Sequence, residues 1–359
     1  MHRHELTKYT HQPILHRVWY APPDPAILGG ASRMLGMLEV RWGMLDIEND
    51  PYVKKLRKSP CDDMELQKVL LTRKTYCNGQ LKKFVERSYH ILEELGGWAA
   101  DYYIHASIEQ LKVAFQDSSS LPGDAGLDNE EKAYVVGILS QIPTPNLEVD
   151  PADPGAMAIS GKMESLIAFL GHRNDLDFSG LVFARQRATV GVMAKLLSIH
   201  PLTKDHFRCA AYVGWSNSNY RKDILGDLLS MNMQQDTLDD FRSGRKNLII
   251  ATDVLEEGID LSACSLVVCY DKPPNLKSFI QRRGRARQRT SMYTIMFPTD
   301  DESPDLRRWK ELERDMVRAY QDDQRRLQAV FDLEDEEEVV SGRFVVESTR
   351  YVVLLSISM

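Results

Sequence analysis

The chain has 359 residues, of which 43% are hydrophobic, so it has room for two domains or three small ones with ordinary cores. It carries 45 lysine and arginine residues against 52 aspartate and glutamate residues, so a general electrostatic attraction to nucleic acid is not expected. Any nucleic-acid binding must therefore come from local patches.

The cysteines and the hydropathy pattern exclude several other classes. The five cysteines are odd in number and show no C-x-x-C pair, which argues against a disulfide framework and against a zinc site. Reduced thiols are typical of cytoplasmic or nuclear proteins, so we expect one of these locations. No run of residues approaches the roughly 18 apolar residues of a membrane span. We therefore expect no membrane partner, and we assign no metal-ligating residues to this chain.

The chain begins with a polar connector, residues 1–22, whose end is compatible with one strand at Val18, Trp19 and Tyr20. Pro22, Pro23 and their neighbours then interrupt regular structure, because each proline removes a backbone donor and restricts the residue before it. A new unit is predicted to begin at this break.

Residues 23–145 are predicted to form an all-helical domain of about five helices, because apolar residues recur at one-turn spacing. We assign the aromatic residues at this spacing to the core. Lysines and arginines between Lys54 and Lys83 could form basic faces toward duplex RNA, or they could be ordinary solvated helix surface. The sequence leaves both interpretations open.

Two segments match functional motifs only in part. Gly155 and Gly161 with Lys162 suggest a P-loop, but five residues separate the glycines where the motif needs four, and Met163 stands where it needs Ser or Thr. We assign Lys162 to the start of a helix instead. Residues 219–227 partly resemble a ribonuclease III signature, but its glutamate is missing, so we assign no nuclease centre there.

Residues 160–300 alternate short apolar strands with amphipathic helices. This alternation predicts an α/β domain with a parallel sheet, helices on both faces and functional loops at the carboxyl ends of the strands. The predicted strands are residues 181–183, 210–213, 248–250, 266–270 and 292–296, and the predicted helices are residues 163–170, 188–197, 237–241 and 276–282.

Residues 247–289 carry side chains suited to phosphate. Five arginines fall between Arg282 and Arg289, and their planar, permanently charged forks match phosphate oxygens. Asp260, just after Gly258, is suited to accept hydrogen bonds from a ribose hydroxyl. In isolation an arginine run is more often a solvated surface, so the combination carries the argument.

Two runs in this region resemble helicase motifs. Residues 251–253 (ATD) with 257–260 (EGID) are similar to motif V of superfamily-two helicases, and residues 281–287 (QRRGRAR) are similar to motif VI. Residues 181–189 (LVFARQRAT) are similar to motif IV. The stretch 241–260, together with motif VI, most resembles the helicase module of fungal Dicer-like proteins. In that family a helical bundle is inserted near the start of the second, RecA-like motor lobe.

The resemblance implies an ATP site with Mg²⁺ between two lobes, of which the second supplies motif V and the arginine fingers. By resemblance, Arg285 and Arg287 stabilise charge on the γ-phosphate and Gln281 orients groups around it. The spacing of motif VI leaves open whether Arg287 or Arg289 is the second finger.

The same resemblance implies further contacts. Gly258 and Asp260 are expected to contact the ribose. Thr252, Arg185 and Arg282 are expected to contact the backbone of double-stranded RNA.

Residues 301–335 are predicted to form a charged helical arm, and residues 340–359 resemble a truncated start of the domain that follows the helicase. The acidic run 334–338 between them is interpreted as a solvated linker. The chain contains no P-loop and no D-E-x-H-type motif, so we expect its partner to be an N-terminal helicase lobe that it lacks.

Three functions remain open at this stage. The first is the C-terminal half of an ATP-dependent double-stranded-RNA helicase module of a Dicer-like endoribonuclease, acting in RNA silencing and antiviral defence. The second is a catalytically silent RNA-binding fragment, and the third is part of a DNA-junction helicase. Whether the isolated chain is an enzyme is also left open.

Overall fold

The fold is described from a computed structural model of the chain. The described residues are 13–24, 31–59, 62–116, 127–149, 157–173, 178–214, 225–229, 232–256, 261, 263–288, 290–301, 307–312, 314–315 and 318. The chain divides into two compact units, Met1–Glu302 and Ser303–Met359. Almost all of the described structure belongs to the first unit.

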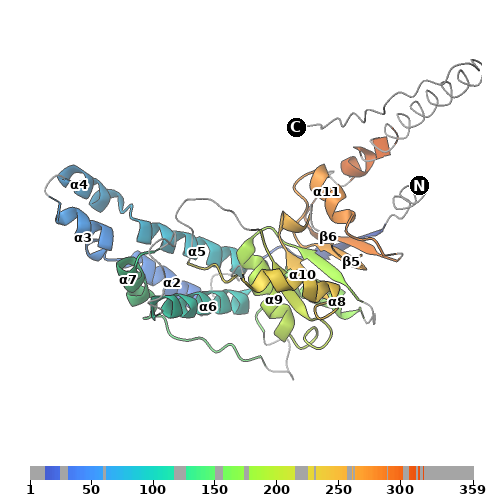
Figure 1. Ribbon diagram of the computed structural model, residues 1–359, viewed down its shortest axis with the longest axis horizontal. Helices are drawn as coiled ribbons and strands as arrows, with labels where there is room; N and C mark the ends of the chain where they lie inside the picture. Colours follow the sequence, from blue (N-terminus) through green and yellow to red (C-terminus); the bar gives the residue numbers. More distant parts are fainter. Residues whose placement is uncertain are drawn as a thin grey trace, which may run out of the picture. The chain divides into compact units, whose positions relative to one another are not determined.

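The first unit contains a six-stranded parallel sheet (Figure 1). Its order is β1-β6-β5-β2-β4-β3. The central strands β2, β4 and β5 are buried along their whole length, as expected for a parallel sheet that is covered on both faces. The strands are β1 (Ile14–Tyr20), β2 (Gly180–Phe183), β3 (Cys209–Tyr212), β4 (Leu248–Ala251), β5 (Leu266–Cys269) and β6 (Met292–Pro298).

Helices α8 (Gly161–Gly171), α9 (Arg187–Ile199), α10 (Asn232–Arg242) and α11 (Leu276–Arg283) alternate with these strands. The predicted fold class, a RecA-like parallel sheet with an all-helical domain, is confirmed. Helix α10 begins earlier than predicted. Its first turns are polar, so they carried no apolar periodicity from which a helix could be recognised.

The strand expected at the end of the connector is β1, and it belongs to the same sheet. It pairs in parallel with β6, with Ile14 opposite Met292 and Tyr20 opposite Pro298. The helical domain lies in the chain between β1 and α8. It is therefore inserted into the sequence of the lobe, after the first strand of the sheet.

The described part of the helical domain contains six α-helices and one short 3₁₀ turn, Ile47–Asn49. Helix α5 buries one face, and Thr75 caps its start by accepting a hydrogen bond from the Asn78 N–H. Figure 1 shows α5 and α6 side by side. The helices are α2 (Arg33–Gly43), α3 (Pro51–Arg57), α4 (Asp63–Thr72), α5 (Tyr76–Leu95), α6 (Gly97–Gln116) and α7 (Asn129–Leu139).

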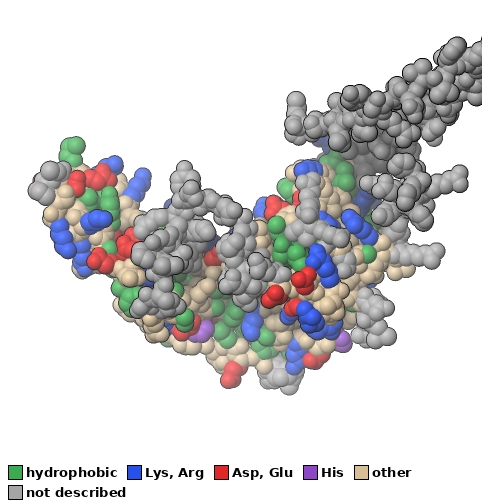
Figure 2. All heavy atoms as spheres, in the orientation of Figure 1, with side chains coloured by type: hydrophobic (Ala, Val, Ile, Leu, Met, Phe, Trp, Pro, Cys, Tyr) green, Lys and Arg blue, Asp and Glu red, His purple; other side chains and the backbone are tan. Residues whose placement is uncertain are grey.

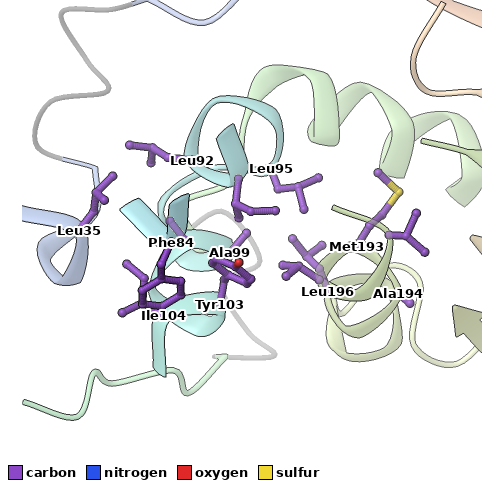
Figure 3. Packing of buried hydrophobic residues seen from close by; sticks show 14 of the residues in the cluster. Leu35, Phe84, Leu92, Leu95, Ala99, Tyr103, Ile104, Met193, Ala194 and Leu196 are labelled. Carbon is purple, nitrogen blue, oxygen red and sulfur yellow. The ribbon is translucent and has the colours of Figure 1, made fainter. Parts of the chain in front are cut away.

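Apolar side chains join the helical domain to the lobe. Leu95 of α5 and Ala99 and Tyr103 of α6 face Met193 and Leu196 of α9 (Figure 3). All five belong to one continuous hydrophobic cluster that runs through both parts. Burial of this shared apolar surface therefore stabilises the contact between the two parts.

In the second unit, residues 307–312 are helical and Trp309 is buried. Most of the predicted arm, and all of residues 340–359, lie outside the described residues. Among the helices that the structure describes, none is both long and apolar enough to cross a membrane.

Candidate functional site

The carboxyl ends of neighbouring strands bring two predicted site residues together. Arg185 follows β2 and Thr252 follows β4, and these strands pair with Phe183 opposite Ala251. The side chain of Arg185 is exposed, whereas Thr252 is buried and its N–H donates to the Tyr212 carbonyl over 3.3 Å. The arrangement presents one exposed guanidinium beside the polar end of β4.

Arg282 is placed differently from what the resemblance implied. It is only 4% exposed, and its Nε donates to Oε1 of Glu256 over 2.7 Å. Its Nη1 donates to the carbonyl of Asp271, and its guanidinium lies 4.9 Å from the ring centroid of Phe183. The guanidinium therefore uses its donors inside the lobe, and an RNA contact by Arg282 would need a different arrangement.

Glu256 connects motif V to motif VI, and our sequence interpretation did not include it. Its carboxylate accepts hydrogen bonds from Ser278 Oγ at 3.0 Å and from Arg282. Its carbonyl accepts one from Nη2 of Arg285 at 3.1 Å. In the sequence Glu256 stands next to Glu257. Nothing in that pattern distinguishes a carboxylate that is bound within the protein from one that is exposed to solvent. The contact fixes the position of α11 against the motif V segment.

The two predicted arginine fingers differ in exposure. Arg285 is 7% exposed and held by Glu256, whereas Arg287 is exposed and its Nε donates to the Gly284 carbonyl over 2.9 Å. Gln281 is half-buried on α11. Their roles at a γ-phosphate stay predictions.

Three other predicted residues cannot be placed. Gly258 and Asp260, expected at the ribose, lie outside the described residues. Arg289, the alternative to Arg287 as second finger, lies outside them as well.

Lys162 occupies a buried position between the helical domain and the lobe. As predicted, it lies in the first turn of a helix, α8. Its Nζ donates to Oε2 of Glu94 over 2.6 Å and to Oδ1 of Asp271 over 3.0 Å. The same atom lies 4.1 Å from the ring centroid of Tyr270. Burial alone would lower the pKa of Lys162, but the two carboxylates outweigh it and raise the pKa above its ordinary value.

Asp271 makes contacts in three directions at the carboxyl end of β5. Besides Lys162, its Oδ2 accepts the Arg185 N–H at 2.6 Å, and its carbonyl accepts from Arg282. Burial alone would raise the pKa of Asp271, but Lys162 and the Arg185 N–H together hold the pKa below its ordinary value. Neither Asp271 nor Glu94 stands in a recognisable motif, so only the fold reveals them.

The basic residues of the helical domain are interleaved with acids. Figure 2 shows lysines and arginines together with acidic side chains over α3 and α4. Arg57 pairs with Glu48 at 2.9 Å, and Lys68 pairs with Glu65 at 3.3 Å. This mixture favours the interpretation as solvated surface over a continuous basic face.

Comparison with known proteins shows which sequences this chain resembles. A model described as the helicase conserved C-terminal domain matches residues 161–289. The chain is 59% identical to Dicer-like protein 2 of Neosartorya fischeri, over 100% of this chain and 26% of the relative. It is 56% identical to Dicer-like protein 2 of Aspergillus terreus, over 97% of this chain and 25% of that protein. The chain thus spans about a quarter of the length of these relatives.

Among solved structures, the C-terminal domain of the DEAD-box protein Dbp5 is similar at 22% identity with a TM-score of 0.34. The match covers 43% of this chain and 79% of that structure.

Proposed function

Since this chain belongs with the fungal Dicer-like proteins of type 2 and contains a helicase C-terminal domain, we propose that it is half of an RNA motor. In this proposal it forms the C-terminal half of an ATP-dependent helicase module of a Dicer-like endoribonuclease. The module acts on double-stranded RNA in RNA silencing and antiviral defence. An N-terminal helicase lobe is its partner.

The position of Arg185 is the observation that carries the RNA part of this proposal. Its exposed side chain stands at the carboxyl edge of the sheet, next to Thr252. Ligands of open parallel sheets bind at this edge. A guanidinium there suits phosphate oxygens of a nucleic-acid backbone, which position a protein on a duplex without reading its sequence.

The hydrogen bonds of Glu256, which connect motif V to motif VI, support the ATP-dependent part of the proposal. Glu256 holds Arg285 in place, and Arg287, two residues later, is exposed. In such motors the first lobe binds Mg²⁺ and the phosphates of ATP, and arginines of the second lobe stabilise the charge that develops on the γ-phosphate. The chain has no P-loop, so it would supply only the second half of this site.

The missing P-loop also favours a specific behaviour of the isolated chain, namely RNA binding without ATP turnover. ATP hydrolysis by the purified chain that is lost in an Arg287→Ala variant would contradict this half-site assignment. We name Arg287 for this test because its side chain is exposed, so its replacement leaves the interior of the lobe intact.

Binding to duplex RNA and duplex DNA of one sequence tests the substrate class. We expect the chain to prefer RNA, with an affinity that falls as salt rises from about 50 to 200 mM, because phosphate contacts release counterions. Equal or tighter binding to DNA would instead support a DNA-junction helicase. Absence of binding to both duplexes would contradict an RNA-binding face on this chain.

A further inference from the structure

We propose that Lys162 is a positioning residue. Through Asp271, it couples helix α5 of the helical domain to the segment after β2 that carries Arg185, called here the Arg185 loop. The inference deepens the proposed function, because it rests on that proposal for what Arg185 binds. The link itself is a matter of contacts within the chain and can be tested without RNA.

The ammonium group of Lys162 is shared by two carboxylates from different parts of the fold. Glu94 lies in the last turn of α5, and Asp271 follows β5. The Lys162 side chain is 8% exposed, and its Nζ contacts both carboxylates at 3.0 Å or less. A buried charge needs its partners, so this lysine is held where both remain within reach.

Glu94 is itself fixed to the lobe through its backbone. Its carbonyl accepts hydrogen bonds from Tyr270 Oη and from Ser160 Oγ, each at 2.5 Å. Ser160 is the N-cap of α8, the helix that carries Lys162, and Tyr270 precedes Asp271. The end of α5 is thereby bound to the two segments of the lobe that carry Lys162 and Asp271.

Asp271 connects Lys162 to Arg185 of motif IV and to Arg282 of motif VI. One carboxylate oxygen contacts Lys162, and the other accepts the N–H of Arg185, two residues after the end of β2. Its carbonyl accepts a hydrogen bond from Arg282 of motif VI. A change in the position of the Asp271 side chain must therefore alter the hydrogen bond that orders the backbone at Arg185.

The charges predict an order of severity for substitutions. Replacing Lys162 by methionine leaves Glu94 and Asp271 as two partly buried carboxylates without their shared cation, so they repel each other. Replacing Glu94 by glutamine leaves the Lys162–Asp271 pair but removes one of its two anchors. The first change should disturb the Arg185 hydrogen bond more than the second.

Hydrogen exchange at the Arg185 amide measures this bond directly. The test compares the full chain with Lys162→Met and Glu94→Gln, and reads Ile250 of β4 as an internal reference. We expect exchange at Arg185 to accelerate by about tenfold or more in Lys162→Met, the effect of losing a hydrogen bond to a charged group. Glu94→Gln should give a smaller acceleration, and Ile250 should stay protected in both.

The control is Thr75→Val, at the opposite end of α5. Thr75 donates a hydrogen bond to Asp50 and caps the helix, so its loss lowers stability without a contact to Lys162. It should leave exchange at Arg185 unchanged.

Two results would overturn the proposal. One is unchanged exchange at Arg185 in Glu94→Gln, since the effect of the helical domain would then not reach the loop. The other is equal acceleration in Thr75→Val, which would assign the effect to general stability. If Lys162→Met does not fold, Glu94→Gln and Thr75→Val decide alone. Failure of the unmodified chain to bind RNA would reject the proposed function but leave this result standing.

Discussion

At the scale of single residues, burial and internal contacts distinguish Arg282 of motif VI from Arg287. Arg282 is held inside the lobe by Glu256 and Asp271, whereas Arg287 is exposed on the same motif. The sequence places both in one basic run and offers no sign of the difference. It did identify Arg185 and Thr252 as neighbours of strand ends, because that follows from the alternation of strands and helices.

The residues around Lys162 lay beyond sequence reasoning for a related reason. Lys162 is 68 positions from Glu94 and 109 from Asp271. No periodicity or motif spans such separations, so the contact exists only once the chain has folded. The sequence could reject the P-loop at Lys162, but it could not say what the lysine binds.

Replacing Arg282 by alanine should destabilise the chain strongly. The substitution leaves the Glu256 carboxylate, whose side chain is 11% exposed, without its cation. Breaking a buried ion pair in this way costs about 3–5 kcal/mol. Urea unfolding of Arg282→Ala measures the cost, with Arg287→Ala as a control that should stay within roughly 0.5 kcal/mol. A small stability loss in Arg282→Ala together with a clear loss of RNA affinity would instead support a direct contact to RNA.

At the scale of elements, the turn between α5 and α6 of the helical domain is hydrogen-bonded to residues 158–160, which precede α8 of the lobe. The Ser160 N–H donates to the Leu95 carbonyl, and the Trp98 N–H donates to the Ala158 carbonyl. Between them Gly96 adopts φ +100, and a Cβ there would lie 2.5 Å from backbone atoms of Ile159. Only glycine permits this approach.

Gly96→Ala should therefore loosen the junction. A non-glycine residue in this backbone region costs about 1–3 kcal/mol before any displacement of Ile159 is counted. Thermal or urea unfolding measures the loss. Gly79→Ala, within α5, is the matched control, because nothing lies within 4 Å of its Cβ position, and it should stabilise the chain by about 0.5–1 kcal/mol. Equal effects of the two substitutions would contradict the role assigned to this turn.

The elements themselves were largely predictable, and the exceptions have physical causes. Buried strands such as β4 and β5 carry apolar runs bounded by polar residues, and amphipathic helices such as α5 carry one-turn spacing. The strand β1 could be suspected, but its partner β6 lies at the other end of the lobe sequence. Pairing between strands so distant leaves no local pattern.

At the scale of the whole molecule, we propose that this chain supplies one part of a motor site. The helical domain and the lobe of the first unit share one hydrophobic cluster, and Lys162 adds a charged link between them. The exposed arginines at the carboxyl edge and at motif VI face what we propose to be RNA and a nucleotide held by another lobe. We propose that the carboxyl edge of the sheet is the RNA-binding face.

A matched pair of arginine substitutions tests this proposal. Arg185 lies at the carboxyl end of β2, whereas Arg245 is an exposed arginine just before the amino end of β4 that pairs with Asp240. The measurement is the affinity of Arg185→Gln and Arg245→Gln for duplex RNA as a function of salt. We expect Arg185→Gln to weaken binding and to reduce the salt slope by about 1, the contribution of one phosphate contact, and Arg245→Gln to bind as the unmodified chain does. Equal effects of the two, or a larger effect of Arg245→Gln, would contradict an RNA-binding face at the carboxyl edge.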